Sequence, residues 1–215
     1  MKHWVFDLDG TLVDSFSRYF KALNEIFQEH GYQFTDAHRE PALTSHLPAF
    51  FRQELGARAV APALTKLLEV SNNDAPLIQP FSGILETIDL LKSRGCQIAV
   101  WTSREFTSTD IILKETGISR KIETFVSGTC VTNRKPDTEG LVRIIEQHEW
   151  NPEEVTMVGD HFHDVQAANQ VGVRSVRASW HSYWKIGTCP DADHQFHSVE
   201  DFHRWVKSSS NGRDG

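Results

Sequence analysis

Five short apolar runs alternate along the chain with longer segments whose apolar residues recur at helical spacing. The runs are rich in β-branched or aromatic residues and end at polar residues or glycine, which is typical of buried strands. In the helical segments, for example, Leu85, Ile88 and Leu91 recur before Gly95. Strands that alternate with helices predict an α/β fold built on a doubly wound parallel sheet. The predicted strands are His3–Leu8, Gln97–Thr102, Glu123–Ser127, Val155–Gly159 and Val173–Arg177.

The segment between the first two predicted strands breaks this alternation because it contains no convincing strand. Residues 16–32 and 46–56 instead place Phe and Leu on one helical face, as amphipathic helices do. A connection this long is exceptional, so we expect an inserted all-helical subdomain. The predicted ranges are 16–80 for this subdomain, 1–15 and 81–207 for the main domain, and 208–215 for a disordered tail rich in Ser, Asn and Gly.

Length, charge and cysteine content limit the classes of protein to which the chain could belong. The 215 residues suffice for one main core with a smaller insert. The net charge of −7, with Lys and Arg scattered, argues against nucleic acid and favours a small diffusible partner. We expect no membrane partner and a cytoplasmic location, because no apolar run approaches a membrane span or a signal peptide. The widely spaced Cys96, Cys130 and Cys189 favour reduced packing residues, and the sequence indicates no oligomeric state.

Two carboxylates stand at the end of the first predicted strand, where a buried chain should be most apolar. Asp7 and Asp9 are two positions apart, so both side chains can face the same way. Gly10 then permits a tight turn. Buried carboxylates are costly unless they are paired or bind a metal. A single aspartate here would indicate an ordinary Asx turn, but two acids followed by Gly-Thr favour a functional site.

Hydroxyl and lysine side chains follow two more of the predicted strands. Thr102 and Ser103 stand at the end of the predicted strand Gln97–Thr102 and could donate hydrogen bonds to an anion. Lys135 precedes Pro136, which we expect to open a helix, so the lysine would lie where anions are attracted. Alone, each has a structural explanation, as a strand threonine or a solvated lysine. Their shared position at strand ends is what makes them candidates.

A second acidic pair follows the fourth predicted strand. If a helix begins near His161, Asp160 lies at its start and Asp164 lies one turn inside, both near the same site. Together with the first acidic pair, these oxygens suit Mg²⁺. His161 and His163 raise zinc or iron as an alternative, although no second His or Cys pair completes such a set.

In this order, the clusters resemble the motifs of the haloacid dehalogenase-like hydrolase superfamily, over residues 3 to about 180. The opening FDLDGTLVDS and the place of the helical insertion are most similar to its phosphoglycolate phosphatase-like group. The resemblance implies a Rossmann-like core with strand order 5-4-1-2-3 and a helical cap of the first type. The matching positions are D-x-D-G-T at Asp7–Thr11, the hydroxyl at Thr102, the lysine at Lys135 and G-D-x-x-x-D at Gly159–Asp164.

The resemblance also implies roles for these residues. Asp7 would attack phosphorus and become a phosphoaspartate, while Asp9 would protonate the leaving oxygen and then activate water. Mg²⁺ would be held by Asp7, the backbone carbonyl of Asp9 and Asp160, with Asp164 in support. Thr102 and Lys135 would bind and neutralise the phosphate.

Substrate contacts are harder to assign from the sequence. Residues beside the second motif, and the turn and helix within the cap, could reach a substrate. For the cap residues, a polar turn between helices is an equally good explanation. The candidate substrate-binding residues are Ser103, Arg104, Ser45, His46 and Arg52.

Three other branches of the superfamily are weighed by single residues. The halide-removing branch lacks the second aspartate, which is present here as Asp9. The phosphonate-cleaving branch needs a cap lysine, and none lies between Ala22 and Thr65. The mutase branch carries an early cap histidine, where Tyr19 stands here. We therefore expect a Mg²⁺-dependent phosphatase acting on a small phosphorylated metabolite, with a sugar-phosphate mutase and a non-catalytic binding protein as alternatives.

Overall fold

The computed structural model describes residues 1–181, 189 and 191–209. They form two compact units: Met1–Asp14 with the described residues from Ile78 onward, and Ser15–Leu77. We call the first the sheet unit and the second the helical unit. The boundaries follow Asp14 and Leu77, whereas those predicted from the sequence follow residues 15 and 80.

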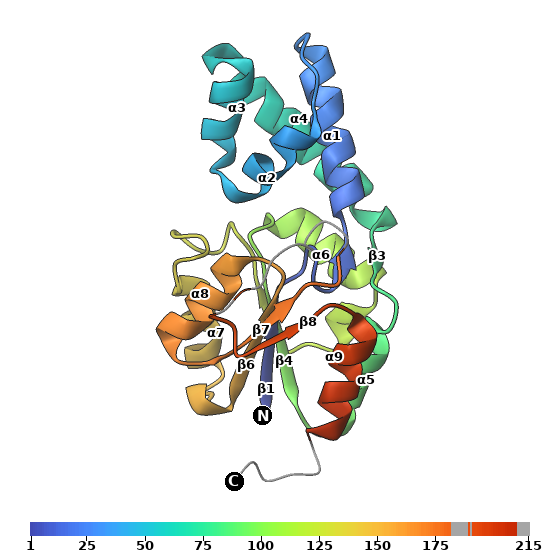
Figure 1. Ribbon diagram of the computed structural model, residues 1–215, viewed down its shortest axis with the longest axis vertical. Helices are drawn as coiled ribbons and strands as arrows, with labels where there is room; N and C mark the ends of the chain where they lie inside the picture. Colours follow the sequence, from blue (N-terminus) through green and yellow to red (C-terminus); the bar gives the residue numbers. More distant parts are fainter. Residues whose placement is uncertain (182–188, 190, 210–215) are drawn as a thin grey trace. The chain divides into compact units, whose positions relative to one another are not determined.

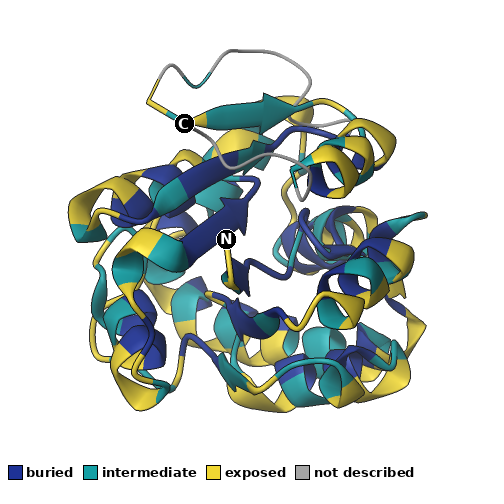
Figure 2. Cartoon of the chain, turned by 90° about the horizontal axis from the view of Figure 1, so that it is seen from below, coloured by how far each residue is buried: buried dark blue, intermediate teal, exposed yellow. Residues whose placement is uncertain are grey.

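The sheet unit is built on six strands in the order β5-β4-β1-β6-β7-β8 (Figure 1). Every neighbouring pair is parallel. Numbered one to five along the chain, the predicted strands are β1, β4, β5, β6 and β7. Read from β7 to β5, their order in the sheet is the predicted 5-4-1-2-3. The predicted α/β fold class is therefore confirmed. The sixth, β8, was not predicted, because it is three residues long and only partly buried (Figure 2). The strands are β1 His3–Phe6, β4 Gln97–Trp101, β5 Thr124–Val126, β6 Val155–Gly159, β7 Arg174–Ala178 and β8 His194–Phe196.

Helices cover both faces of this sheet, with α7 and α8 on one side and α5 and α9 on the other (Figure 1). Successive residues of β1 therefore pack in opposite directions: Trp4 and Phe6 contact Phe202 of α9, whereas Val5 packs with Leu141 of α7. Burial on both faces explains why the strands are continuous apolar runs. The helices are α5 Ile84–Ser93, α6 Phe106–Glu115, α7 Glu139–Gln147, α8 Phe162–Val171 and α9 Val199–Ser208, with short 3-10 turns at Ile118–Arg120 and Pro152–Glu154.

The end of the chain differs in part from the prediction of a disordered tail over 208–215. Ser208 is the last residue of α9, so the helix extends into this range. Residues 210–215 lie outside the described residues.

The helical unit contains four α-helices and no strand. The predicted amphipathic segments correspond to α1 and α3, and their apolar faces meet in a core that includes Leu23, Phe27 and Phe51. Among the described residues of the whole chain, no helix has both the length and the apolar character needed to cross a membrane. The helices are α1 Phe16–Glu29, α2 Asp36–Thr44, α3 Leu47–Leu55 and α4 Val60–Asp74, with 3-10 turns at Ala57–Ala59 and Ala75–Leu77.

A two-stranded ribbon joins the two places where the chain leaves and re-enters the sheet unit. Strand β2 (Val13–Asp14) pairs antiparallel with β3 (Gln79–Pro80). Asp14, which follows the first acidic pair in the sequence, thus belongs to this ribbon.

Candidate active site

The first acidic pair lies at the carboxyl end of the central strand β1. The backbone N–H of Asp7 donates to the carbonyl of Val158 in β6, which extends the sheet pairing by one residue. Asp7 is buried and Leu8 between the acids points into the core. Gly10 has a φ of 78°, a left-handed conformation that favours glycine, and it turns the chain immediately after Asp9.

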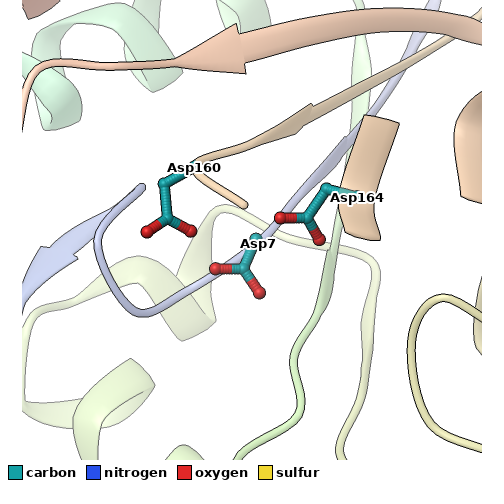
Figure 3. Close-up of side chains that lie close together, drawn as sticks. All are labelled: Asp7, Asp160 and Asp164. Carbon is teal, nitrogen blue, oxygen red and sulfur yellow. The ribbon is translucent and has the colours of Figure 1, made fainter. Parts of the chain in front are cut away.

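Three aspartates from separate segments converge at this end of the sheet (Figure 3). Asp7 follows β1, Asp160 follows β6, and Asp164 lies in the first turn of α8. One carboxylate oxygen from each lies within 4.8 Å of the others, and all three residues are buried. The predicted convergence of these acids follows from parallel strands, whose carboxyl ends share one edge.

Lys135 is the cation of this cluster. Its Nζ lies 2.7 Å from Asp7 Oδ1 and 2.7 Å from Asp164 Oδ1, and the side chain is only 5% exposed. Nζ also donates to the carbonyl of Trp101 at 2.7 Å and lies 4.6 Å from the centre of the Trp101 ring. The lysine is therefore held in place by two carboxylates, a carbonyl and an aromatic face.

Burial shifts the pKa values of this cluster. Loss of water raises the pKa of Asp7 to about 7, and the negative charge of Asp164 adds to the increase, while Lys135 opposes it. Burial by itself lowers the pKa of Lys135, but the carboxylates of Asp164 and Asp7 reverse this, so its pKa is raised and it stays protonated. Three buried carboxylates and one lysine leave an excess of negative charge, which suits a divalent cation.

The predicted helix start at Pro136 is wrong. Helix α7 begins three residues later, at Glu139. The Asp137 carboxylate accepts the Glu139 N–H at 2.9 Å, and the Glu139 carboxylate accepts the N–H of Asn133 at 2.8 Å. These local hydrogen bonds favour a turn over helix here, so Lys135 lies in a loop and reaches the acids by its length.

Gly159 makes room for Asp164. A Cβ at Gly159 would lie 2.3 Å from Cγ of Asp164, closer than real Cβ contacts. Oδ2 of Asp164 also accepts the N–H of His161 at 3.1 Å, and Nδ1 of His161 accepts the N–H of His163 at 3.2 Å. Burial lowers the pKa of His161 to about 4, so this ring is a neutral N-cap of α8. Among the described residues, the carboxylate cluster includes neither histidine.

Asp9 lies outside the three-carboxylate cluster. Its carboxylate pairs with Arg104, with Oδ1 at 2.6 Å from Nη2. Thr102 directly follows β4, is buried, and its hydroxyl oxygen accepts the N–H of Arg104 at 3.1 Å. Ser103 between them is exposed. The structure therefore brings Asp7, Asp160, Asp164 and Lys135 together, and it gives Arg104 a protein partner.

The candidates in the helical unit are all exposed. Ser45 directly follows α2, His46 precedes α3, and Arg52 lies in the last turn of α3. Their predicted contact with a substrate stays a prediction.

Trp101 and Gly140 were not singled out from the sequence. Trp101 supports Lys135 with its carbonyl and its ring. A Cβ at Gly140, in α7, would lie 2.1 Å from Nε1 of Trp101, so glycine lets the helix pass this ring. The only signal in the sequence is a bulky aromatic residue at the last strand position before Thr102.

Comparison with known proteins assigns this arrangement to a family. Residues 4–178 match the family model described as haloacid dehalogenase-like hydrolase. The chain is 26% identical over 196 residues to a phosphoglycolate phosphatase of Synechococcus elongatus, covering 89% of this chain and 91% of that protein. It is 28% identical over 183 residues to the pyrophosphatase PpaX of Bacillus velezensis, covering 82% of each. The solved structure of CbbY from Rhodobacter sphaeroides in complex with phosphate aligns with a TM-score of 0.81 at 19% identity, covering 94% of this chain and 96% of that chain. As the motifs predict, the protein belongs to the haloacid dehalogenase-like hydrolases and is similar to their phosphoglycolate phosphatases.

Proposed function

We propose that this hydrolase is a Mg²⁺-dependent phosphatase that acts on a small phosphorylated metabolite through a phosphoaspartate. The observation that carries the proposal is the buried cluster of Asp7, Asp160 and Asp164, with Lys135 bound to two of them. Like charges gathered away from water are unfavourable unless they bind a cation or react. Because the cluster lies where parallel sheets bind ligands, chemistry explains it better than stability does.

The donor set fits Mg²⁺, whose usual ligands are carboxylate and carbonyl oxygens, water and phosphate. Asp7, Asp160 and Asp164 would hold the ion, with the backbone carbonyl of Asp9 as the further ligand that the family resemblance implies. When bound, Mg²⁺ supplies positive charge that offsets both the carboxylate and the phosphate. Burial alone raises the pKa of Asp7, so Asp7 needs this positive charge to remain an ionised nucleophile at neutral pH.

The proposed reaction has two displacements at phosphorus. In the first, a carboxylate oxygen of Asp7 forms a bond to phosphorus while the bond to the leaving oxygen breaks, and Asp9 protonates that oxygen. In the second, water attacks phosphorus, Asp9 takes up a proton, and the bond between Asp7 and phosphorus breaks to release inorganic phosphate. Lys135 offsets the charge of Asp7, and we assign the hydroxyl of Thr102 to an oxygen of the phosphate.

The names of the relatives support a small phosphate-containing substrate, since one is a phosphoglycolate phosphatase and another a pyrophosphatase. Hydrolysis is favoured over the mutase reaction because the Tyr19 hydroxyl, which stands where mutases carry histidine, donates to the carbonyl of Ala42 at 2.9 Å. By the family resemblance, the helical unit would serve as the cap, with Ser45, His46 and Arg52 as candidates for substrate contact.

A screen of phosphorylated metabolites and 4-nitrophenyl phosphate tests this function. We expect wild-type protein to release phosphate with Mg²⁺ and to stop when EDTA removes the metal. Asp7→Asn should lower kcat by roughly a thousandfold or more, because an amide cannot act as the nucleophile. Asp36→Asn, at a side chain that is 89% exposed in the helical unit, is the matched control and should leave kcat unchanged. Full activity of Asp7→Asn, or none in wild type on any phosphoester, would refute the proposal.

A further inference from the structure

The Asp9 carboxylate is held by Arg104 at two points. Nη2 of Arg104 donates to Oδ1 of Asp9 at 2.6 Å, and Nε donates to Oδ2 at 3.0 Å and to Oδ1 at 3.2 Å. The Arg104 side chain is 12% exposed and that of Asp9 is 23% exposed, so water screens this pair only partly. Planar guanidinium groups bind carboxylates in this two-point manner more rigidly than an ammonium group can.

The loop that carries Arg104 is itself fixed. The N–H of Arg104 donates to the hydroxyl of Thr102. The carbonyl of Arg104 accepts the N–H of Gly128 at 2.7 Å. A Cβ at Gly128 would lie 2.2 Å from the carbonyl oxygen of Ser103, so glycine is what lets the segment after β5 approach this loop. Nη1 of Arg104 also lies 3.4 Å from the hydroxyl oxygen of Ser108 in α6. These contacts hold the backbone of Arg104, and its guanidinium in part, beside Asp9.

We propose that Arg104 is a positioning residue for Asp9, in place of the direct substrate contact predicted from the sequence; this inference rests on the proposed phosphatase function. The hydrogen bonds from Nη2 and Nε of Arg104 hold the Asp9 carboxylate in one orientation. Such an orientation matters because proton transfer requires a donor within hydrogen-bond reach of the reacting oxygen.

Both oxygens of Asp9 accept from Arg104, Oδ1 from Nη2 and Oδ2 from Nε. In the proposed reaction, Asp9 gives a proton to the leaving oxygen as the phosphorus–oxygen ester bond breaks and the bond from Asp7 to phosphorus forms. When water later forms its bond to phosphorus and the bond from Asp7 breaks, a proton of that water returns to Asp9.

A leaving-group comparison separates positioning from substrate binding. An alkyl phosphate such as glycerol phosphate needs its leaving oxygen protonated, whereas 4-nitrophenolate leaves without a proton. The value of kcat/KM reports the first displacement for both substrates. We expect Arg104→Met to lower kcat/KM at least about tenfold more for the alkyl phosphate, a part of the roughly hundredfold to ten-thousandfold that general acids supply.

Two further variants complete the experiment. Arg104→Lys keeps the charge without the two-point contact and should fall between wild type and Arg104→Met. In the Asp9→Asn background, Arg104→Met should lower kcat/KM by less than about a further threefold, because the effects of substituting residues that act as a unit are not additive. Arg204→Met, at a 66% exposed side chain of α9, is the control for loss of one arginine and should leave kcat/KM unchanged.

The outcomes are distinct. An equal loss for both substrates, with a raised KM that persists in the Asp9→Asn background, would show that Arg104 binds substrate and would overturn the positioning role while leaving the phosphatase intact. If wild type hydrolyses neither substrate, both proposals fail, because Asp9 then has no proton transfer to orient. Thermal melting shows whether each variant is folded. If Arg104→Met is not folded, Arg104→Lys is compared with wild type on the two substrates instead.

Discussion

Asp7 and Asp9 are separated by one residue, yet the structure surrounds them with different partners. Asp7 is buried beside two further aspartates and Lys135, which come from other strand ends. Asp9 is partly exposed and pairs with the guanidinium of Arg104. The first environment gathers negative charge and suits a cation, whereas in the second a guanidinium already pairs with the carboxylate. Identical side chains thus receive different surroundings from the elements that meet them.

The largest test of this contrast replaces each aspartate in turn. Asp7→Asn should lower kcat/KM by roughly a thousandfold or more for alkyl and aryl phosphates alike, because the nucleophile is lost. Asp9→Asn should lower kcat/KM by about a hundredfold or more for an alkyl phosphate, yet within about fivefold of wild type for 4-nitrophenyl phosphate. Steady-state kinetics on both substrates measures the difference. Equal profiles for the two variants would contradict the division of roles.

The next effect concerns the space around Asp164. In Gly159→Ala the new methyl group would overlap the Asp164 carboxylate, so that side chain must shift from the position in which it pairs with Lys135. We expect a loss of about 1 to 3 kcal/mol in the free energy of unfolding and a fall in kcat of about tenfold to a hundredfold. Chemical denaturation and phosphate release measure these two quantities.

Gly31→Ala in the helical unit is the comparison for Gly159→Ala. No atom lies within 4 Å of its new Cβ, although its φ of 80° adds local strain. Gly31→Ala should lower the free energy of unfolding by about 1 kcal/mol and leave kcat unchanged. If Gly159→Ala behaves in the same way, steric exclusion around Asp164 is not what glycine provides there.

Part of this arrangement could be predicted from the sequence, and the reasons are physical. Buried strands are continuous apolar runs, so the five main strands are visible, and parallel topology then brings Asp7 and Asp160 to one edge. The pairing of Asp9 with Arg104 depends on how two loops approach each other, for which local patterns carry no signal. The sequence therefore predicts Arg104 only as a substrate contact, which stays a prediction, and gives no indication of its pairing with Asp9.

Local competition explains the error at Pro136. Proline there does suit the first turn of a helix, but the side chains of Asp137 and Glu139 accept backbone N–H groups and hold a turn instead. Strand β8 escaped prediction because three half-buried residues show no clear period.

A smaller effect follows from the raised pKa of Asp7. Without metal, the folded protein binds a proton at Asp7 that the unfolded chain releases near pH 4. The contribution of Asp7 to stability is therefore fully present below that pH and is lost as pH rises through about 7. Mg²⁺ should offset the decline, raising Tm by about 5 °C or more at pH 7.5 when present at a hundred times its Kd, and by less at pH 5.5. Asp160→Asn should remove most of this metal effect in thermal melts. An equal increase in Tm at both pH values would contradict the assignment of Asp7 to the metal.

The smallest effect should come from His161, which lies beside the acidic cluster without joining it. Its ring accepts the N–H of His163 as the N-cap of α8, and burial keeps it neutral. Asparagine is a good N-cap, so His161→Asn should change the free energy of unfolding by less than about 1 kcal/mol and kcat by less than about twofold. His161→Leu, which cannot accept that bond, should cost about 1 kcal/mol more than His161→Asn. If His161→Asn instead abolished activity and Zn²⁺ supported wild-type turnover better than Mg²⁺, the histidine would act on the metal, and the cluster around Asp7 would need a nitrogen ligand.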